Sequence, residues 1–341
     1  MNKKKLVTIV SCLVLIALIG TTQVGAASLD DIVYAYGGNN LGIRNGTTLA
    51  NVADYSGCGD VIDIDFLSDG KIVVLNTAGD LRIFNPDLTH HDSRYGWFAN
   101  PVGIEVQSDD DIVISYGGSL NVRSSTFANK FDLANYFPGA TDIDLRSNDD
   151  IVIWYDNGAN QDYFSVRNGT TGGGVSDSAW TGVTAFAVQS NDYTVFSKDE
   201  LWQGTWYDSM NIRKADWSNQ AYQDGWRGTE LMEVQPDDDV VFSRDNGTNW
   251  EINIRGASDL SSVAYMGEFS EITGLAIQSD GDVVQASGGY IGIRNGGDLS
   301  NQIETGISDV TVLGVYNVPE PATMTLLGIG ALALIRRRKR A

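Results

Sequence analysis

A repeat of about 40 residues constrains the fold of this chain more than any other feature of its sequence. Each copy has an apolar segment, a turn rich in Ser and Asp, a second apolar segment, a Gly or Asn turn, and a third segment ending in Arg, as in GIEVQSDDDIVISYGGSLNVR from Gly103. The residue that opens the Ser/Asp turn recurs at spacings of 40, 39, 43, 46 and 43 residues. These anchors are Ser68, Ser108, Ser147, Ser190, Pro236 and Ser279. Several short strands in each period of this length predict the blades of a β-propeller.

The two ends of the repeat region complement each other. SLDDIVYAYGGNNLGIRNG from Ser28 matches the second and third strands of a copy and has no first strand, whereas SDVTVLGVYNV from Ser308 matches a first strand alone. Together they complete a seventh copy, and their pairing removes the open sheet edges. The sequence therefore predicts an all-β, seven-bladed propeller over residues 27–317, closed by pairing of the N- and C-terminal strands.

Strand and turn composition agree with this fold. Continuous apolar runs such as Ile112–Ile114 are typical of strands covered on both faces. Asn-Gly pairs between such runs favour hairpin turns. These pairs are Asn45-Gly46, Asn168-Gly169, Asn246-Gly247 and Asn295-Gly296.

The chain carries a formal charge of −21, and eight of its 23 basic residues lie within Lys3–Lys5 and Arg336–Arg340. The acidic body disfavours nucleic acid and anionic lipid as partners.

The N-terminal segment predicts a signal peptide over residues 1–26, cleaved between Ala26 and Ala27. It contains the basic residues Lys3–Lys5, an apolar stretch over 6–20 and small residues before Ala27. Cys58 is then the single cysteine of the mature chain, so an internal disulfide is excluded.

The C-terminal segment contains an apolar run of 14 residues, 322–335, followed by basic residues. This run is shorter than the roughly 20 residues of a full membrane span, and the basic end would stay cytoplasmic. Alone, these features predict a simple membrane anchor. The preceding residues are Val318, Pro319, Glu320 and Pro321.

With this motif, residues 318–341 resemble the PEP-CTERM sorting signal of exported bacterial proteins. The resemblance implies recognition by a membrane-embedded exosortase that cleaves near the Pro-Glu-Pro motif, after transient anchoring in the inner membrane. It also implies a Gram-negative host that makes exopolysaccharide, and a final place at the cell surface or outside the cell. The repeats themselves loosely resemble those of large secreted bacterial propellers.

The sequence positions no catalytic group. Its two histidines, His90 and His91, are adjacent, and neighbouring residues of a strand point to opposite faces, which disfavours a shared metal ion. The acidic turns 109–111, 148–150 and 237–239 recur at equivalent places, so calcium is one interpretation. The other is that Asp, Asn and Gly are what tight turns require. No turn has the full alternating Asp pattern of a calcium loop, so no metal or other cofactor is predicted.

Two further residue types recur at fixed repeat positions, which favours structural roles. We expect each repeated arginine to pair with a turn aspartate or a backbone carbonyl. The arginines are Arg44, Arg123, Arg167, Arg213, Arg255 and Arg294, with Phe84 in the remaining copy. The glutamines are Gln107, Gln189, Gln235 and Gln278.

Tryptophan breaks the regularity, because seven of eight lie between residues 154 and 250, where the repeats are longest. Flat aromatic faces beside amides and carboxylates suit stacking on sugar rings, whereas packing between blades is the alternative. The candidate ligand-binding residues are Trp202, Trp206, Trp217 and Trp226.

Three functions remain open from the sequence. The first is a non-enzymatic exported propeller that binds carbohydrate or another matrix component. The second is a polysaccharide lyase or glycosidase that uses paired carboxylates. The third is a passive structural protein of the matrix.

Overall fold

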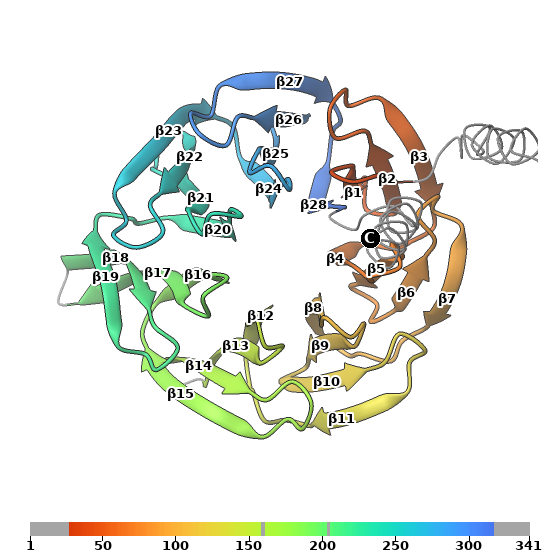
Figure 1. Ribbon diagram of the computed structural model, residues 1–341, viewed down its shortest axis with the longest axis horizontal. Helices are drawn as coiled ribbons and strands as arrows, with labels where there is room; N and C mark the ends of the chain where they lie inside the picture. The colour runs from red at the N-terminus through yellow and green to blue at the C-terminus, as the bar shows by residue number, and fades with distance from the viewer. Residues whose placement is uncertain (1–26, 158–160, 203–204, 317–341) are drawn as a thin grey trace, which may run out of the picture.

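The structure, a computed structural model, describes residues 27–157, 161–202 and 205–316. These segments form 28 β-strands and no helix, arranged as seven four-stranded antiparallel sheets around a central axis (Figure 1). Each sheet is one blade of a propeller, with its first strand beside the axis and its fourth strand at the rim. The predicted all-β, seven-bladed propeller is confirmed.

The blades are numbered from the N-terminus, and their strands are given from the axis to the rim. Blade 1 contains β28 (Val310–Val315), β1 (Ile32–Tyr36), β2 (Asn40–Arg44) and β3 (Asn51–Ser56). Blade 2 contains β4 (Val61–Phe66), β5 (Ile72–Asn76), β6 (Leu81–Phe84) and β7 (His90–Arg94). Blade 3 contains β8 (Pro101–Val106), β9 (Ile112–Tyr116), β10 (Ser119–Arg123) and β11 (Asn129–Leu133). Blade 4 contains β12 (Ala140–Leu145), β13 (Ile151–Asp156), β14 (Asp162–Arg167) and β15 (Gly174–Trp180).

The longest strands are in blade 5, which contains β16 (Val183–Val188), β17 (Thr194–Trp202), β18 (Thr205–Arg213) and β19 (Asn219–Asp224). Blade 6 contains β20 (Thr229–Val234), β21 (Val240–Asp245), β22 (Trp250–Arg255) and β23 (Ser262–Phe269). Blade 7 contains β24 (Ile272–Ile277), β25 (Val283–Ser287), β26 (Tyr290–Arg294) and β27 (Asn301–Gly306).

The ring closes as the complementary ends predict. The C-terminal strand β28 is the innermost strand of blade 1 and pairs antiparallel with β1, from Ile32 opposite Val315 to Tyr36 opposite Val310. Beyond the strands, the Tyr316 N–H donates to the Asp31 carbonyl and the Asp30 N–H donates to the Tyr316 carbonyl. Residues nearly 290 positions apart in the sequence therefore complete one sheet.

The core lies between the blades and accounts for the continuous apolar runs. All five residues of β5 are buried, because blade 2 is covered on both faces by its neighbours. In one interface cluster, Leu75 of blade 2 packs with Ile104 and Ile114 of blade 3. A strand covered on both sides cannot alternate polar and apolar residues, which explains the runs.

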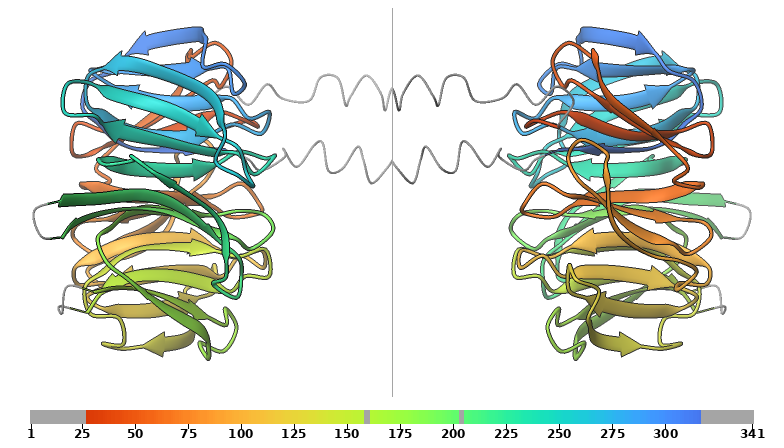
Figure 2. Two further views of the ribbon diagram at one scale, coloured as in Figure 1. Left: turned by 90° about the vertical axis from the view of Figure 1, so that its left-hand side faces the viewer. Right: turned by 90° about the vertical axis from the view of Figure 1, so that its right-hand side faces the viewer.

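The disc has two distinct faces. We call one the turn face, because it carries the Ser/Asp turns between first and second strands. The other is the hairpin face, which carries the hairpins between second and third strands and the connections between blades. The described chain ends, Ala27 and Tyr316, lie on the turn face, whereas the β17–β18 hairpin projects from the hairpin face (Figure 2).

On the turn face, a serine of one blade is hydrogen-bonded to an aspartate of the next. Asp149 adopts the left-handed conformation with φ of 65°, which Asp tolerates, and its carboxylate accepts the Ser108 N–H at 2.9 Å as well as the Ser108 hydroxyl. We call this arrangement the Ser–Asp link. It joins Ser68 to Asp110, Ser108 to Asp149, Ser147 to Asp192, Ser190 to Asp238, and Ser279 to Asp30.

Two junctions lack this link, and both have glycine in place of the aspartate. Between blades 6 and 7, Pro236 has no N–H to donate and Gly281 stands at the aspartate position. Between blades 1 and 2, a Cβ on Gly70 would lie 1.9 Å from the Tyr316 hydroxyl oxygen. The sequence of each turn therefore depends on its neighbour around the ring.

The repeated glutamines have the structural role that repetition indicated. Each side-chain amide donates to the carbonyl at the aspartate or glycine position of the following turn. These bonds run from Gln107 to Asp149 at 2.9 Å, Gln189 to Asp238 at 2.7 Å, Gln235 to Gly281 at 2.6 Å, and Gln278 to Asp30 at 3.0 Å. Gln235 thus joins blades 6 and 7, where the Ser–Asp link is absent.

Three of the four Asn-Gly pairs do not form the tight hairpins that their sequence favoured. Asn45, Asn168 and Asn295 begin longer turns between third and fourth strands, as the bond from the Asn45 N–H to the Ala50 carbonyl shows. Gly46, Gly169 and Gly296 do not have positive φ. Glycine is needed there for close approach, because a Cβ on Gly169 would lie 2.0 Å from the Asp149 carbonyl oxygen.

Carboxylates line the central channel, a feature that the sequence did not lead us to expect. They come from the first strands and border cavities of about 550 and 360 Å³. The acidic residues are Asp63, Asp65, Glu105, Asp142, Asp144, Glu230 and Glu233. Lys, Arg and His are absent from the described residues that line these two cavities.

Several channel aspartates accept hydrogen bonds from backbone N–H groups on the first strand of a neighbouring blade. The first strand of each blade has no partner strand on its axis side, so some N–H groups there need another acceptor. Asp63 accepts the Ile104 N–H at 2.8 Å, and Asp144 accepts the Val188 N–H at 2.6 Å. These carboxylates join the first strands of neighbouring blades.

The channel raises the pKa values of its carboxyl groups. Desolvation by burial is the main cause, and it raises the pKa of Asp63 to about 6 despite two backbone hydrogen bonds that oppose the shift. Burial, with the nearby charges of Asp144, Asp142 and Asp63, raises the pKa of Glu233 to about 8. Burial, with the charges of Asp65 and then of Asp144, Asp63 and Asp142, raises the pKa of Glu105 well above its usual value.

These shifts predict that the fold is more stable at pH 5 than at pH 8. The folded state keeps protons that the unfolded chain releases near pH 4, so the stability falls as pH rises from about 4 through the raised pKa values to about 8. Urea unfolding across this range should show the fall. Glu233→Gln should reduce this fall in stability because it removes one channel carboxyl group whose pKa is raised, whereas Asp109→Asn, at an exposed turn outside the channel, should leave the fall unchanged. A free energy of unfolding that rises from pH 5 to pH 8 would contradict the assignment.

The Ser–Asp links predict a specific loss of stability. Asp149→Asn keeps a residue that tolerates positive φ but replaces one carboxylate oxygen by a donor, so the free energy of unfolding should fall by about 1–2 kcal/mol. Asp237→Asn is the matched control in another turn, because Asn148 and Asn191 already make the equivalent bond. Chemical denaturation measures both variants, and equal stabilities would count against the link.

Candidate functional site

The four candidate tryptophans do not lie together as one exposed surface. Trp226 is 7% exposed, with its ring edge-on to Phe242 at 5.2 Å and the Arg255 guanidinium 4.2 Å from its centre. Trp217 stacks on Phe164 of blade 4 at 5.5 Å, and its indole N–H donates to the Ser176 hydroxyl. Trp226 is thus buried and Trp217 half-buried, and both rings pack against side chains of the fold.

Trp202 and Trp206 lie at the end of the β17–β18 hairpin. Its strands are nine residues long, against four to six for the second and third strands of other blades, and Trp202 pairs with Thr205. The hairpin extends beyond the hairpin face (Figure 2). The side chains of residues 200–207 lie outside the part that the structure describes, so the stacking role of Trp202 and Trp206 stays a prediction.

An apolar residue recurs three positions before each first strand, and its side chain fills the gap between blades. We call this residue the plug. The plugs are Cys58, Phe98, Phe137, Trp180, Trp226, Phe269 and Ile307. Trp180 and Trp226 are therefore members of a structural series that includes phenylalanines.

Five of the repeated arginines stack on the aromatic plugs, a contact that the sequence did not predict. The expected bond to a backbone carbonyl is present for Arg123, which donates to the Phe127 carbonyl at 3.2 Å. The distances from guanidinium to ring centre are 5.9 Å for Arg123 and Phe98, 5.2 Å for Arg167 and Phe137, 4.5 Å for Arg213 and Trp180, 4.2 Å for Arg255 and Trp226, and 5.6 Å for Arg294 and Phe269. Where the plug is Ile307, Arg44 lies over Tyr34 instead. Where it is Cys58, the arginine position is Phe84. The cation–π contact explains why arginine and aromatic residue occur together.

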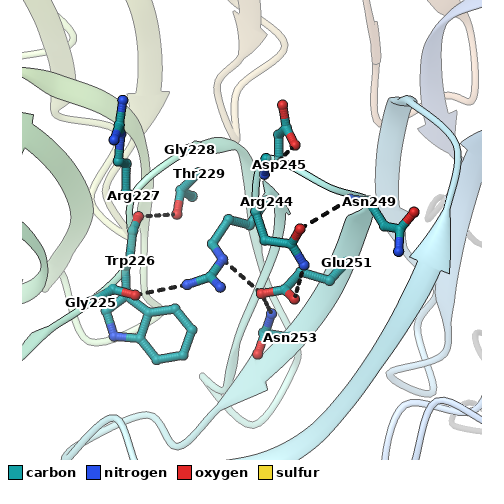
Figure 3. A network of polar contacts seen from close by, with 12 residues as sticks. Gly225, Trp226, Arg227, Gly228, Thr229, Arg244, Asp245, Asn249, Glu251 and Asn253 are labelled. Atoms are coloured by element: carbon teal, nitrogen blue, oxygen red, sulfur yellow. Dashed lines mark hydrogen bonds and ion pairs between the residues drawn. The ribbon is translucent and has the colours of Figure 1, made fainter.

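A buried ion pair holds the connection between blades 5 and 6 (Figure 3). The Arg244 Nε lies 2.7 Å from a carboxylate oxygen of Glu251, which is 3% exposed, and Arg244 also donates to the Gly225 carbonyl at 2.7 Å. Asn246 and Asn253 donate to the same carboxylate. Through the bond from Arg244 to the Gly225 carbonyl, this network fixes the backbone next to Trp226.

A basin of about 490 Å³ lies beside this network, at the hairpin face of blade 6. Its charged and polar lining residues are Arg227, Glu230, Arg244, Asp245 and Asn246. Burial raises the pKa of Glu230, and the charges of Asp245 and Glu271 add to this shift. Carboxylate and amide groups around an open basin suit a ligand rich in hydroxyl groups.

The acidic turns do not converge on a common point. Asp149 accepts the Ser–Asp link, Asp111 pairs with Lys130, and Asp239 accepts the Ala257 N–H. Within residues 27–157, 161–202 and 205–316, no group of three or more His, Cys, Asp or Glu side chains is arranged to hold a metal ion. His90 is exposed and meets Phe84 edge-on at 6.0 Å.

Sequence reasoning missed the exposed aromatic residues of the hairpin face. Trp97, the tryptophan outside the 154–250 cluster, is 46% exposed, and Tyr136 is 58% exposed. Both immediately precede a plug, in the connections β7–β8 and β11–β12. Comparison of this position across the seven copies, rather than the density of tryptophan along the chain, would have found them.

Several solved structures have a similar fold at low sequence identity. The match covers seven-tenths or more of each of those chains. U3-55K matches with a TM-score of 0.62 at 12% identity over 79% of this chain and 90% of its own. The computationally designed protein Ika8 has a TM-score of 0.60 at 16% identity over 84% and 88%. The dihydro-heme d1 dehydrogenase NirN matches with 0.61 at 10% over 87% and 78%. These likenesses show the propeller fold alone.

The sequence matches no curated protein. Residues 317–340 match the model of the PEP-CTERM protein-sorting motif, which includes the predicted Val318, Pro319, Glu320 and Pro321. These four residues, and the predicted signal peptide 1–26 with Ala26, lie outside the described residues. No helix in the described part of the chain is long and apolar enough to span a membrane. The chain is thus a seven-bladed propeller with a C-terminal PEP-CTERM sorting motif, which marks it as an exported protein processed by exosortase.

Proposed function

We propose that the mature protein is a non-enzymatic, exported propeller that binds carbohydrate or another component of the extracellular matrix. The observation that carries this proposal is the long β17–β18 hairpin on the hairpin face, with Trp202 and Trp206 at its end. A paired strand that extends past its blade adds surface without adding to the core, which favours an interaction role.

The two faces support the same proposal. Ala27 and Tyr316 lie on the turn face, so the segment that bears the sorting motif continues from that face. The hairpin and the basin of blade 6 lie on the opposite face. A protein held by its C-terminal segment would present the hairpin face to its surroundings, at the surface of a Gram-negative cell or outside it.

A polysaccharide-cleaving enzyme is the second candidate, favoured by one observation. Glu230 and Asp245 both line the basin, and the pKa of Glu230 is raised by burial and by Asp245. Glycosidases use two carboxyl groups, one of which is held protonated by its surroundings. Turnover of polysaccharide that Glu230→Gln abolishes would establish this function in place of simple binding.

Processing gives a first test. Protein recovered from the medium or surface of the native host should begin at Ala27 and lack Arg336–Arg340, because both terminal signals are removed. Intact-mass analysis measures both ends at once. A retained basic end would identify a plain membrane anchor instead.

Substitution of the hairpin tryptophans gives the second test. Trp202→Ala and Trp206→Ala should weaken binding to oligosaccharides of matrix polymers by about 1–3 kcal/mol, with an unchanged melting temperature, if the rings stack on sugar. Trp226→Ala should instead destabilise the fold by about 3–5 kcal/mol, because Trp226 is buried.

Tyr222→Ala, at an exposed position of β19 in the same blade as the hairpin, is the control for aromatic surface in general. Isothermal titration and thermal unfolding measure the set together. Absence of any glycan binding or turnover in the wild type would leave a passive structural role.

A further inference from the structure

Exposed aromatic residues precede the plugs of blades 3 and 4. Trp97 is 46% exposed and Tyr136 is 58% exposed, while the adjacent plugs Phe98 and Phe137 are 2% and 1% exposed. The plug already closes the space between blades at each connection. A second, exposed ring is therefore not needed to close that space.

The other copies show that the fold does not need an aromatic residue there. The residues at this position in the five other connections are small or charged. They are Gly57, Ala179, Gly225, Glu268 and Gly306. The aromatic rings thus break the repeat in two successive connections of one sector, at an exposed position, which favours recognition over structure.

The backbone holds both rings in place. The Trp97 N–H donates to the Gly79 carbonyl at 3.1 Å. The N–H that follows Tyr136, that of Phe137, donates to the Gly118 carbonyl at 2.8 Å. Each connection is thereby tied to the hairpin of the preceding blade, so little backbone freedom remains to be lost when a ligand binds.

Arginines fix the rings themselves. The Arg123 guanidinium lies 4.6 Å from the Trp97 ring centre and the Arg94 guanidinium 5.5 Å from it, yet the Trp97 side chain stays 46% exposed. The Arg167 guanidinium lies 4.9 Å from the ring centre of Tyr136. Arg123 and Arg167 also contact the adjacent plug, so one cation positions a buried ring and an exposed ring together. An exposed ring that is already oriented makes a low-entropy contact surface.

We propose that Trp97 and Tyr136 form two stacking subsites for an extended polysaccharide strand along the hairpin face of blades 3 and 4. The ligand class is an oligosaccharide whose pyranose rings present their C–H faces, since such faces pack against flat aromatic rings. The rings belong to neighbouring blades, so the ligand spans more than one sugar unit. This inference rests on the proposed binding of carbohydrate, but uses residues distinct from the β17–β18 hairpin.

The test compares full-length mature wild type with Trp97→Ala, Tyr136→Ala and the double variant. Isothermal titration uses neutral and uronate-containing oligosaccharides of increasing length. We expect each single substitution to weaken binding about tenfold and the double variant to lose the gain in affinity with oligosaccharide length. Tyr290→Ala is the matched control, because Tyr290 is 54% exposed on the same face in blade 7.

Trp97→Phe should keep most of the affinity, whereas Trp97→Leu, which keeps apolar packing without a flat face, should not. Melting temperatures should stay at the wild-type value throughout, and a marked fall in all Trp97 variants would assign the ring to the fold and overturn the subsites. Wild-type binding that these variants leave intact would overturn the subsites while the proposed function stands. No binding by the wild type to any oligosaccharide would overturn both.

Discussion

Pairing between the two ends of the chain is the interaction on which the rest of the structure depends. β28 supplies the strand that blade 1 lacks, and through it the first and last blades become neighbours. Only in a closed ring does every blade have a neighbour on both faces, which is why second strands such as β5 can be wholly apolar. The Ser279–Asp30 link and the Gln278 amide join the same junction on the turn face. Closure is therefore secured twice, by main-chain hydrogen bonds within the sheet of blade 1 and by hydrogen bonds on the turn face between blades 7 and 1.

Most of the repeated side chains serve contacts between blades. Serine and aspartate link adjacent turns, glutamine reaches the next turn's carbonyl, and arginine stacks on the plug. Each contact has a partner in the neighbouring copy, so changes occur in pairs. Pro236 is matched by Gly281. The aliphatic plug Ile307 is matched by Arg44, which lies over Tyr34 instead, and the thiol plug Cys58 is matched by Phe84 at the arginine position. Residues that break the pattern at an exposed position, as Trp97 and Tyr136 do, are candidates for a role in function.

The sequence predicted the number of blades and the closure because both follow from counting copies and comparing ends. It could not show which way a repeated side chain points, so the stacking of Arg255 on Trp226 and the burial of that ring emerged only in three dimensions. Tryptophans that are close in sequence lie in different interfaces, because the segment that contains them runs through several blades. The channel carboxylates were missed for a related reason. Asp63 and Glu233 are about 170 residues apart and meet only because every first strand faces the axis.

The position of Tyr316 has a mechanical consequence. Its side chain is 1% exposed and meets Phe66 of blade 2 edge-on at 5.5 Å, while its backbone is bonded to Asp30 and Asp31. The residues that match the sorting motif, 317–340, begin directly after it. Tension on the C-terminal segment would therefore reach the folded body at Tyr316 and pass directly into β28, the strand that keeps the ring shut. Seated between blades 1 and 2, the tyrosine spreads that load over two blades, and cutting the chain at the motif would relieve it without disturbing the closure.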